Sequence, residues 1–329
     1  MITPAYSPTA TERVLPRMAL DFTTGVLDSR VTIARALNTA TRTNSSGALE
    51  IVNANLPRFD YDPTTLAPKG LLIEEARTNL FLNSLIDGTS LSTQTVAVTA
   101  IAYTISFYGT GTITLSGAST ATVTGTGVYP NRKTLTFTPI VGALICTVTG
   151  SVQYAQIEAG AFATSFIPTA ATSITRNADV VSMTGTNFSD WYNASEGAFA
   201  IWHRLIGYSS SNMLLTLTDS GATNLLQYYL VSPTSSFFLV RSSGVDQSAL
   251  NTTVSSTTLN KTVGAYKTND FAAASNGGVA ATDASGTIPT VDRMGIGSRL
   301  GALVYNGHIQ QISYWPQRLT TPEIRAFSK

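Results

Sequence analysis

Residues 56–84 read LPRFDYDPTTLAPKGLLIEEARTNLFLNS, and this stretch concentrates prolines, charges and apolar residues. Pro57, Pro63 and Pro68 oppose helix formation here, because proline lacks the backbone N–H that a helix interior needs. The run from Asp60 to Pro63 offers the side-chain acceptors of an Asx turn. We therefore expect two extended segments joined by a turn.

An apolar triplet and a charged cluster follow that turn. Leu71, Leu72 and Ile73 precede Glu74, Glu75 and Arg77 in a chain that has few charges. A charged cluster beside a buried triplet indicates a junction in the fold. The alternative is a solvated turn with local salt bridges, which stabilise little when they are exposed.

The same stretch carries a resemblance. It resembles a segment of tailed-bacteriophage structural proteins in the phrases PRFDYDP, GLLIEEARTNL and NS. The phrase LDFTTG, residues 20–25, lies upstream and belongs to the same resemblance. The phage proteins are tail fibres, tailspikes and other receptor-binding or virion-surface proteins, in which the segment precedes β-sandwich modules. The resemblance implies a virion protein that assembles in the host cytoplasm, with a homotrimer as the expected oligomer.

The composition narrows the possible partners. Charged residues are 12% of the 329-residue chain, against about 25% in average globular proteins, which fits a β-rich protein. The net charge of +1 creates no long-range field, so we expect neither nucleic acid nor an anionic membrane as a partner. The sequence shows no basic segment followed by an apolar leader, and no apolar run of about eighteen residues. We therefore expect neither secretion by a standard signal nor membrane insertion.

Cys146 is the only cysteine, which excludes an internal disulfide and a cysteine-based zinc site. It lies in the apolar run from Ala143 to Cys146, so we interpret it as a buried small hydrophobic residue.

Residues 78–181 show the pattern of a β-sandwich. Apolar residues alternate with Thr or Ser in short segments separated by glycine-rich turns, as in half-buried antiparallel strands. The closing part, VQYAQIEAGAFATSFIPTAATSITRNADVV from Val152, resembles the end of carbohydrate-binding-module-like sandwiches in phage proteins. We interpret Glu158, Arg176 and Asp179 in it as interdomain or intersubunit ion pairs rather than as a catalytic group.

Residues 182–329 predict a second sandwich. Alternating segments lie at 197–204, 213–218, 225–231 and 237–241, and Thr320 and Glu323 have the spacing of a helix capping box with Pro322 between them. The order MGIG, NGHIQQISYW and LTTPEI resembles the closing part of the laminin-G-like, concanavalin-A-like lectin fold.

The predicted fold class is therefore all-β, with two jelly-roll β-sandwich domains in tandem after an extended N-terminal attachment region. The expected ranges are 1–77 for the attachment region, in which no self-contained core is evident, 78–181 for the first sandwich and 182–329 for the laminin-G-like sandwich. By the resemblance, the N-terminal region would contact other virion proteins.

Aromatic side chains are the candidates for glycan binding, because their faces stack on sugar rings. The candidates are Trp191, Tyr192, Tyr208 and Tyr228, of which Trp191 and Tyr192 lie in a turn-like setting and are expected to be exposed. Trp202 and Tyr314 are expected to point into the sandwich, since they lie in alternating strands.

No catalytic residue is predicted. The paired acids of laminarinase-like glucanases, Glu-x-Asp-x-x-Glu, do not occur, and His203 and His308 lack a nucleophile-elbow context. We expect no cofactor. Calcium is the one metal considered, since laminin-G-like domains bind it in some cases, with Asp219, Asn224 and Asp270 as oxygen donors.

The sequence thus predicts a phage tail fibre or receptor-binding protein that recognises host surface glycans without cleaving them. Two alternatives remain open at this point. One is a structural decoration or adaptor protein of the capsid, tail or baseplate, and the other is a tailspike that depolymerises polysaccharide.

Overall fold

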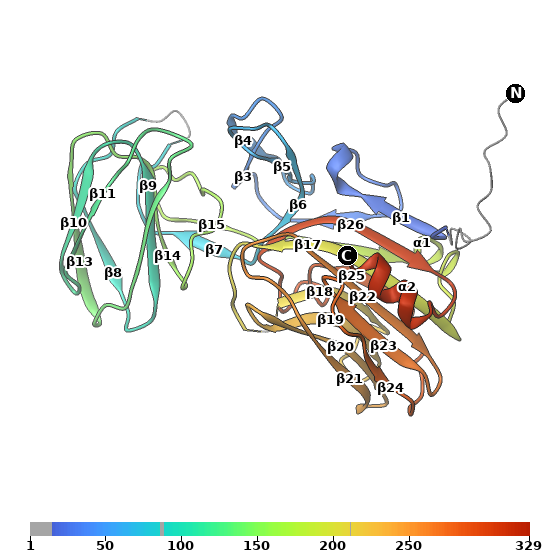
Figure 1. Cartoon of the computed structure of the whole chain (residues 1–329). Helices are drawn as coiled ribbons and strands as arrows, with labels where there is room; N and C mark the ends of the chain where they lie inside the picture. The colour runs from blue at the N-terminus through green and yellow to red at the C-terminus, as the bar shows by residue number, and fades with distance from the viewer. Residues whose placement is uncertain (1–14, 86–88, 211) are drawn as a thin grey trace, which may run out of the picture.

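The computed structural model describes residues 15–85, 89–210 and 212–329, which form a larger and a smaller β-sandwich with a β-hairpin beside them (Figure 1). The strand pairing is antiparallel throughout the named sheets, so the all-β, β-sandwich prediction is confirmed. The part of the predicted N-terminal region at residues 1–14 lies outside the described residues. Within the described ranges no helix is long and apolar enough to cross a membrane.

The larger sandwich consists of two sheets, named sheet A and sheet B here. Sheet A contains, in spatial order, β24 (Ala281–Asp283), β23 (Phe271–Ser275), β22 (Asn260–Lys267), β17 (Glu196–Leu205), β26 (Gly307–Trp315), β6 (Pro68–Ile73) and β5 (Phe59–Tyr61), with β1 (Met18–Asp21) also on β26. Sheet B contains β2 (Thr32–Ala34), β16 (Val180–Thr184), β25 (Arg293–Ile296), β18 (Asn212–Thr218), β19 (Leu225–Ser232), β20 (Ser235–Ser242) and β21 (Val245–Thr253). Large apolar side chains from both sheets fill the core between them.

The N-terminal residues complete this larger sandwich. β1 and β6 pair with opposite ends of β26 on the same edge, and β2 pairs with β16 at the edge of sheet B. Residues from the first and third expected ranges therefore share two sheets and one core. This explains why the N-terminal stretch shows no core of its own: its apolar side chains, including Leu20 and Ile73, pack against the C-terminal strands.

The smaller sandwich packs one sheet of β11 (Ala121–Thr124), β10 (Thr112–Gly117), β13 (Gly142–Thr149) and β8 (Gln94–Val98) on a second sheet of β12 (Lys133–Phe137), β9 (Tyr103–Tyr108) and β14 (Gln153–Ala159). It has its own apolar core, which includes Cys146. Cys146 is fully buried, as predicted, and burial raises the pKa of its thiol to about 12.

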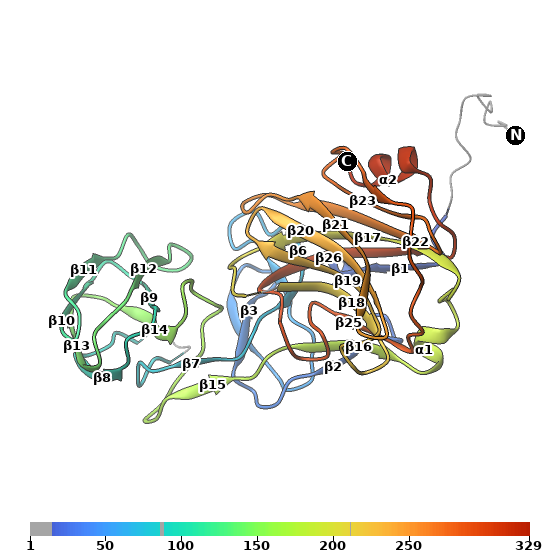
Figure 2. The ribbon, with the colours of Figure 1, turned by 90° about the horizontal axis from the view of Figure 1, so that it is seen from below.

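The chain enters and leaves the smaller sandwich through adjacent strands. β7 (Arg77–Asn79) and β15 (Ile174–Arg176) pair antiparallel, and Figure 2 shows them side by side between the two sandwiches. The smaller sandwich is therefore inserted between strands of the larger one, instead of simply preceding it along the chain.

The stretch 56–84 forms the expected hairpin. β5 and β6 pair through Phe59 and Leu71, and the Asp62 carboxylate accepts the backbone N–H groups of Thr64 and Thr65 at 3.0 and 2.8 Å. Gly70 has φ +97°, and a Cβ atom there would lie 2.5 Å from the Ile309 carbonyl oxygen, so glycine is needed for β6 to approach β26.

A second hairpin stands beside it, formed by β3 (Ala40–Thr43) and β4 (Leu49–Val52). Short helices complete the fold: η1 (Phe22–Thr24), α1 (Thr186–Ser189) and α2 (Thr321–Phe327). The capping box of α2 is confirmed, with Thr320 and Glu323 bonded to each other's backbone N–H groups. Ile324 of α2 belongs to an apolar cluster with small residues of sheet A, and α2 packs on β22 and β23, so it covers one end of the outer face of the sheet.

A buried ion network lies where the hairpins and the two sandwiches meet. Glu74 pairs with Arg58 at 2.7 Å and with Arg176 at 2.8 Å, and Asp179 pairs with Arg35 at 2.8 Å and also with Arg58. All five side chains are at most 3% exposed. The charged cluster after the apolar triplet is therefore a buried junction and not a solvated turn, and Arg176 and Asp179 form the ion pairs expected of them. The same expectation is wrong for Glu158. Its buried carboxylate has no ion-pair partner among the described residues and instead accepts hydrogen bonds from the backbone N–H and the hydroxyl of Thr164 at 2.8 and 2.7 Å.

Further hydrogen bonds satisfy the carboxylates of this network. The Ser165 backbone N–H and hydroxyl donate to Glu74 at 2.7 and 2.6 Å, and the Glu74 backbone N–H donates to Asp179 at 3.0 Å. Although burial alone would raise the pKa of Glu74, the charges of Arg176 and Arg58 and the Ser165 hydrogen bond hold it well below its usual range.

We predict that Glu74→Gln lowers the free energy of unfolding by about 3–5 kcal/mol, because it leaves the buried Arg176 without its paired carboxylate and takes one of two carboxylates from the buried Arg58. Urea denaturation followed by circular dichroism measures this. The matched control is Glu50→Gln, which disrupts the partly exposed Arg42–Glu50 pair and should cost less than about 1 kcal/mol. Equal losses in the two variants would contradict the importance of the network.

We also predict that the protein loses stability in acid through Glu74. Because the folded pKa of Glu74 lies below its ordinary value of 4.5, its contribution is present above that value and is lost as the pH falls below it. The free energy of unfolding of the wild type should therefore fall more between about pH 5 and about pH 3 than that of Glu74→Gln. Parallel pH profiles would disprove the assignment.

Candidate functional site

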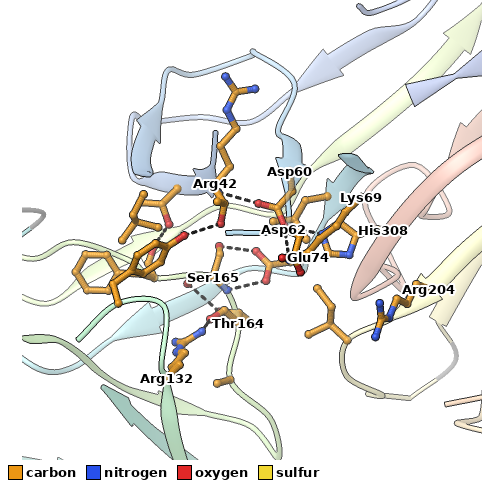
Figure 3. Close-up of a pocket in the computed structure, with 18 of the residues that line it drawn as sticks. Arg42, Asp60, Asp62, Lys69, Glu74, Arg132, Thr164, Ser165, Arg204 and His308 are labelled. Atoms are coloured by element: carbon orange, nitrogen blue, oxygen red, sulfur yellow. Dashed lines mark hydrogen bonds and ion pairs between the residues drawn. The ribbon is translucent and has the colours of Figure 1, made fainter. Parts of the chain in front are cut away.

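A cleft of about 390 Å³ opens where the outer face of sheet A meets the smaller sandwich and the β3–β4 hairpin (Figure 3). We call it the interdomain cleft. Its lining comes from β3, β5, β6, β17 and β26, from the smaller sandwich, and from residues 163–166, which lie between β14 and β15. The ion network described above forms part of its base, since Glu74 and Ser165 line it.

The floor of the cleft is the part of sheet A that α2 leaves uncovered. Arg204 of β17, His308 of β26 and Leu72 of β6 are directly opposite one another across three strands and share a face. Their chain neighbours Leu205 and Ile309 point to the other face and belong to the core. The alternation of each strand therefore presents these three side chains to the cleft.

Asp60 and His308 form a buried pair on this floor. His308 Nε2 lies 2.8 Å from Asp60 Oδ2, and Lys69 Nζ lies 3.7 Å from the same oxygen. The Thr43 backbone N–H donates to Asp60 Oδ1 at 2.8 Å. Burial would raise the pKa of Asp60, but the hydrogen bond and charge of His308, with the charge of Lys69, lower it.

Two tyrosines and an arginine of the smaller sandwich form the opposite wall. The rings of Tyr108 and Tyr129 have centroids 5.3 Å apart, and the Tyr129 hydroxyl lies 2.9 Å from the Thr43 hydroxyl. Arg132 donates to the Thr164 carbonyl at 2.6 Å and to the Ser106 hydroxyl at 2.7 Å. Aromatic rings, hydroxyls and guanidinium groups thus face the acidic and basic groups of the floor.

Arg204 differs from the other charged residues of the cleft. It is exposed, and within the described ranges no hydrogen bond or ion pair joins its guanidinium group to another residue. In Figure 3 it lies on the side of the cleft away from Arg132, with no dashed line to it.

The structure places two of the predicted glycan-binding residues in the core. Trp191 is 3% exposed and donates its indole N–H to the Asn187 carbonyl at 2.7 Å, and Tyr228 is 1% exposed with its hydroxyl 2.9 Å from that of Thr252. A sugar ring cannot stack on either side chain in this conformation. The expectation that Trp191 is exposed is wrong, because the one-turn helix α1 turns the ring into an aromatic cluster with Phe188 and Tyr314.

The other two candidates are only partly exposed. Tyr192 stacks on Phe188 with ring centroids 4.8 Å apart, and Tyr208 donates its hydroxyl to the Val231 carbonyl at 2.5 Å. Neither lines the interdomain cleft. Their role in glycan binding remains a prediction.

Trp202 and Tyr314 were both expected to face the core. Tyr314 does so and is fully buried. Trp202 lies instead on the outer face of sheet A, since its neighbour Ile201 occupies the core, and Lys261 Nζ lies 4.2 Å from the centroid of its ring system.

The three candidate calcium ligands have protein partners. Asp219 accepts the side-chain N–H of Asn224 at 2.7 Å, and Asp270 pairs with Arg318 at 2.7 Å. Among the residues that the structure describes, no three His, Cys, Asp or Glu side chains gather in a way that suits a metal ion.

Sequence reasoning did not identify the interdomain cleft. His308 lies 248 residues from its partner Asp60, and no local pattern links the two positions. The available signals were the DYDP turn, which contains Asp60, and the charged cluster that contains Glu74, both within the stretch that we selected as the organising one.

Comparisons with known proteins give only distant similarities. No family model matches the chain, and no curated protein matches it. Among solved structures, the NanB sialidase of Streptococcus pneumoniae has a TM-score of 0.39 at 14% identity, over 45% of this chain and 26% of the sialidase chain. The CBM40 domain of the Ruminococcus gnavus IT-sialidase bound to α2,3 sialyllactose has a TM-score of 0.38 at 15% identity, over 42% of this chain and 84% of that one.

Botulinum neurotoxin type C, whose cell entry depends on two ganglioside molecules, is a third similar structure, with a TM-score of 0.36 at 8% identity over 46% of this chain and 39% of the toxin chain. This chain thus spans about a quarter of the length of the sialidase that it resembles. The similar structures include carbohydrate-binding β-sandwich domains. The β-sandwich assignment of this chain rests on its own strand pairing, and its site on its own side chains.

We predict that Trp191→Ala destabilises the fold by about 3–5 kcal/mol, because it leaves a large cavity in the core. The midpoint of urea denaturation measures this. Trp202→Ala is the matched control and should cost clearly less, since Trp202 lies half-buried on the outer face. A Trp191→Ala protein as stable as the wild type would contradict the core position.

Proposed function

We propose that this protein is a surface protein of a tailed-bacteriophage virion, of the tail-fibre or receptor-binding type, and that it binds host surface glycans in the interdomain cleft without cleaving them. The glycan part of the proposal depends on the geometry of the cleft. The phage part depends on the resemblance of residues 56–84 and of LDFTTG to phage structural proteins.

The observation that carries the proposal is the composition of the cleft wall and floor. Tyr129 is partly exposed and offers ring surface, with the buried Tyr108 packed behind it, while Thr43, Arg132 and Arg204 offer hydrogen-bonding groups within the same cavity. Protein sites for small ligands typically have about 300–1,000 Å³ and combine aromatic surface with a few polar groups. A cavity of about 390 Å³ accommodates one or two sugar units of a longer chain.

The acids of the cleft support binding without hydrolysis. A glycosidase needs one carboxyl group with a raised pKa as general acid. Asp60, Asp62 and Glu74, the carboxyl groups that line the cleft, all have a pKa below the ordinary value, because His308, backbone N–H groups and arginines respectively stabilise the charged form. Each of them is thus suited to accept hydrogen bonds and not to donate a proton.

The remaining parts of the proposal concern assembly. We propose a homotrimer located on the virion, attached to other virion proteins through the N-terminal region. The residues of that region from β1 onward are part of the larger sandwich, so a surface for attachment would lie next to the glycan-binding module itself.

The experiment uses a panel of purified bacterial capsular polysaccharides and lipopolysaccharide O-chains, and follows retention of the protein on each polymer together with the length of the polymer. We expect retention on at least one polymer with no shortening. Tyr129→Ala should weaken retention about fivefold or more, since a ring in contact with the ligand contributes more than about 1 kcal/mol, while Tyr129→Phe should retain it.

The control variant is Tyr229→Ala. Tyr229 is a half-buried tyrosine of β19 in sheet B that does not line the cleft, and its loss should leave retention unchanged. Retention on none of the polymers would favour a structural role as a decoration or adaptor protein. Shortening of a polymer would show a depolymerase.

A further inference from the structure

The charges that line the interdomain cleft are unequally satisfied. Its carboxylates all have partners within the protein: Glu74 has Arg58 and Arg176, Asp60 has His308 and Lys69, and Asp62 accepts two backbone N–H groups. No acidic group of the cleft therefore requires a ligand.

The guanidinium groups of the cleft differ from one another. Arg42 pairs across the hairpin with Glu50 at 2.6 Å. Among the described residues Arg132 donates to neutral oxygens, those of Thr164 and Ser106, so no paired carboxylate compensates its charge. Arg204 has no partner among the described residues. Arg132 and Arg204 stand on different sandwiches, and Figure 3 shows them on opposite sides of the cleft.

The position of Arg204 makes its charge available to a ligand. It lies directly opposite His308 across the β17–β26 ladder, which places the two Cβ atoms within about 5.5 Å of each other. The His308–Asp60 pair therefore lies beside Arg204, and the tyrosines of the smaller sandwich line the same cavity. A guanidinium group binds a carboxylate with two parallel hydrogen bonds, and the bond strengthens where water is partly excluded.

We propose that the interdomain cleft is selective for sugars that carry a carboxylate, such as uronic or sialic acid units of an acidic polysaccharide, and that Arg204 binds that carboxylate. This inference rests on the proposed glycan-binding function and specifies its ligand. The net charge of the chain is only +1, so the selectivity comes from this local contact and not from a long-range field.

The test measures the affinity for the polysaccharide that the panel identifies as the strongest ligand, and for the same polymer after its carboxylates are reduced to alcohols. Carboxyl reduction should weaken binding to the wild-type protein about tenfold or more, as expected for the loss of a charged hydrogen-bonded pair. Arg204→Gln should lose a similar factor for the native polymer and little for the reduced polymer, because the two changes remove the same contact. Arg204→Lys should lie between Arg204→Gln and the wild type.

Arg299→Gln is the matched control, since it removes one arginine that does not line the cleft. Thermal unfolding of Arg204→Gln should match that of the wild type, because no described residue depends on this side chain. Equal binding of native and reduced polymer, a strongest ligand without carboxylates, or an unchanged affinity of Arg204→Gln would overturn the inference while leaving glycan binding in place. Binding to no polymer would remove the proposed function and this inference together.

Discussion

The buried pairing of Glu74 and Asp179 with three arginines is the constraint on which the rest of the structure depends. Its members lie at residues 35, 58, 74, 176 and 179, on both sides of the inserted sandwich. Buried charges are unfavourable unless all their partners are in place. The hairpins, the connecting strands and the first strand after the insertion must therefore reach their positions together, and the cleft that lies above this network takes its shape from them.

The outer face of sheet A has two halves of different polarity. At one end Ala198 and Ala200 belong to the apolar cluster that α2 covers by packing on β22 and β23. At the other end the same strand places Arg204 outward, and β26 places His308 beside it, so this end is polar. The smaller sandwich approaches this polar end through residues 163–166 and its tyrosines, and it leaves space between the two surfaces. Along β17 the outward side chains change from Ala198 and Ala200 through Trp202 to Arg204, and the cleft lies at the arginine end.

Much of the fold was predictable from local patterns, because alternation, turn residues and the capping box act over a few residues. The alternation at residues 95–98, 103–107, 111–115, 134–137 and 144–148 predicts β8, β9, β10, β12 and β13, and the hairpin at 59–73 and helix α2 are predicted in the same way, whereas β11 is not. The exchange of strands between distant segments was not predictable, since β1 and β6 find their partner in β26 through burial that no local pattern records. The prediction of the glycan-binding residues was wrong for Trp191 for the same reason. Trp191 was judged from its polar neighbours, whereas the aromatic cluster that encloses it comes from β17, β22 and β26.

The paired strands β7 and β15 have a consequence for how such a protein changes over generations. Because the chain enters and leaves the smaller sandwich at neighbouring positions, the two ends of the inserted segment lie together and the segment has its own core. Recombination that exchanges this segment need not rethread the larger sandwich, provided that the arginine and acid partners outside it are kept and that the new segment supplies the hydrogen bonds that Ser165 donates to Glu74. Such an exchange would replace the side chains that the smaller sandwich contributes to the cleft. The side chains that sheet A contributes, including Arg204, would stay the same.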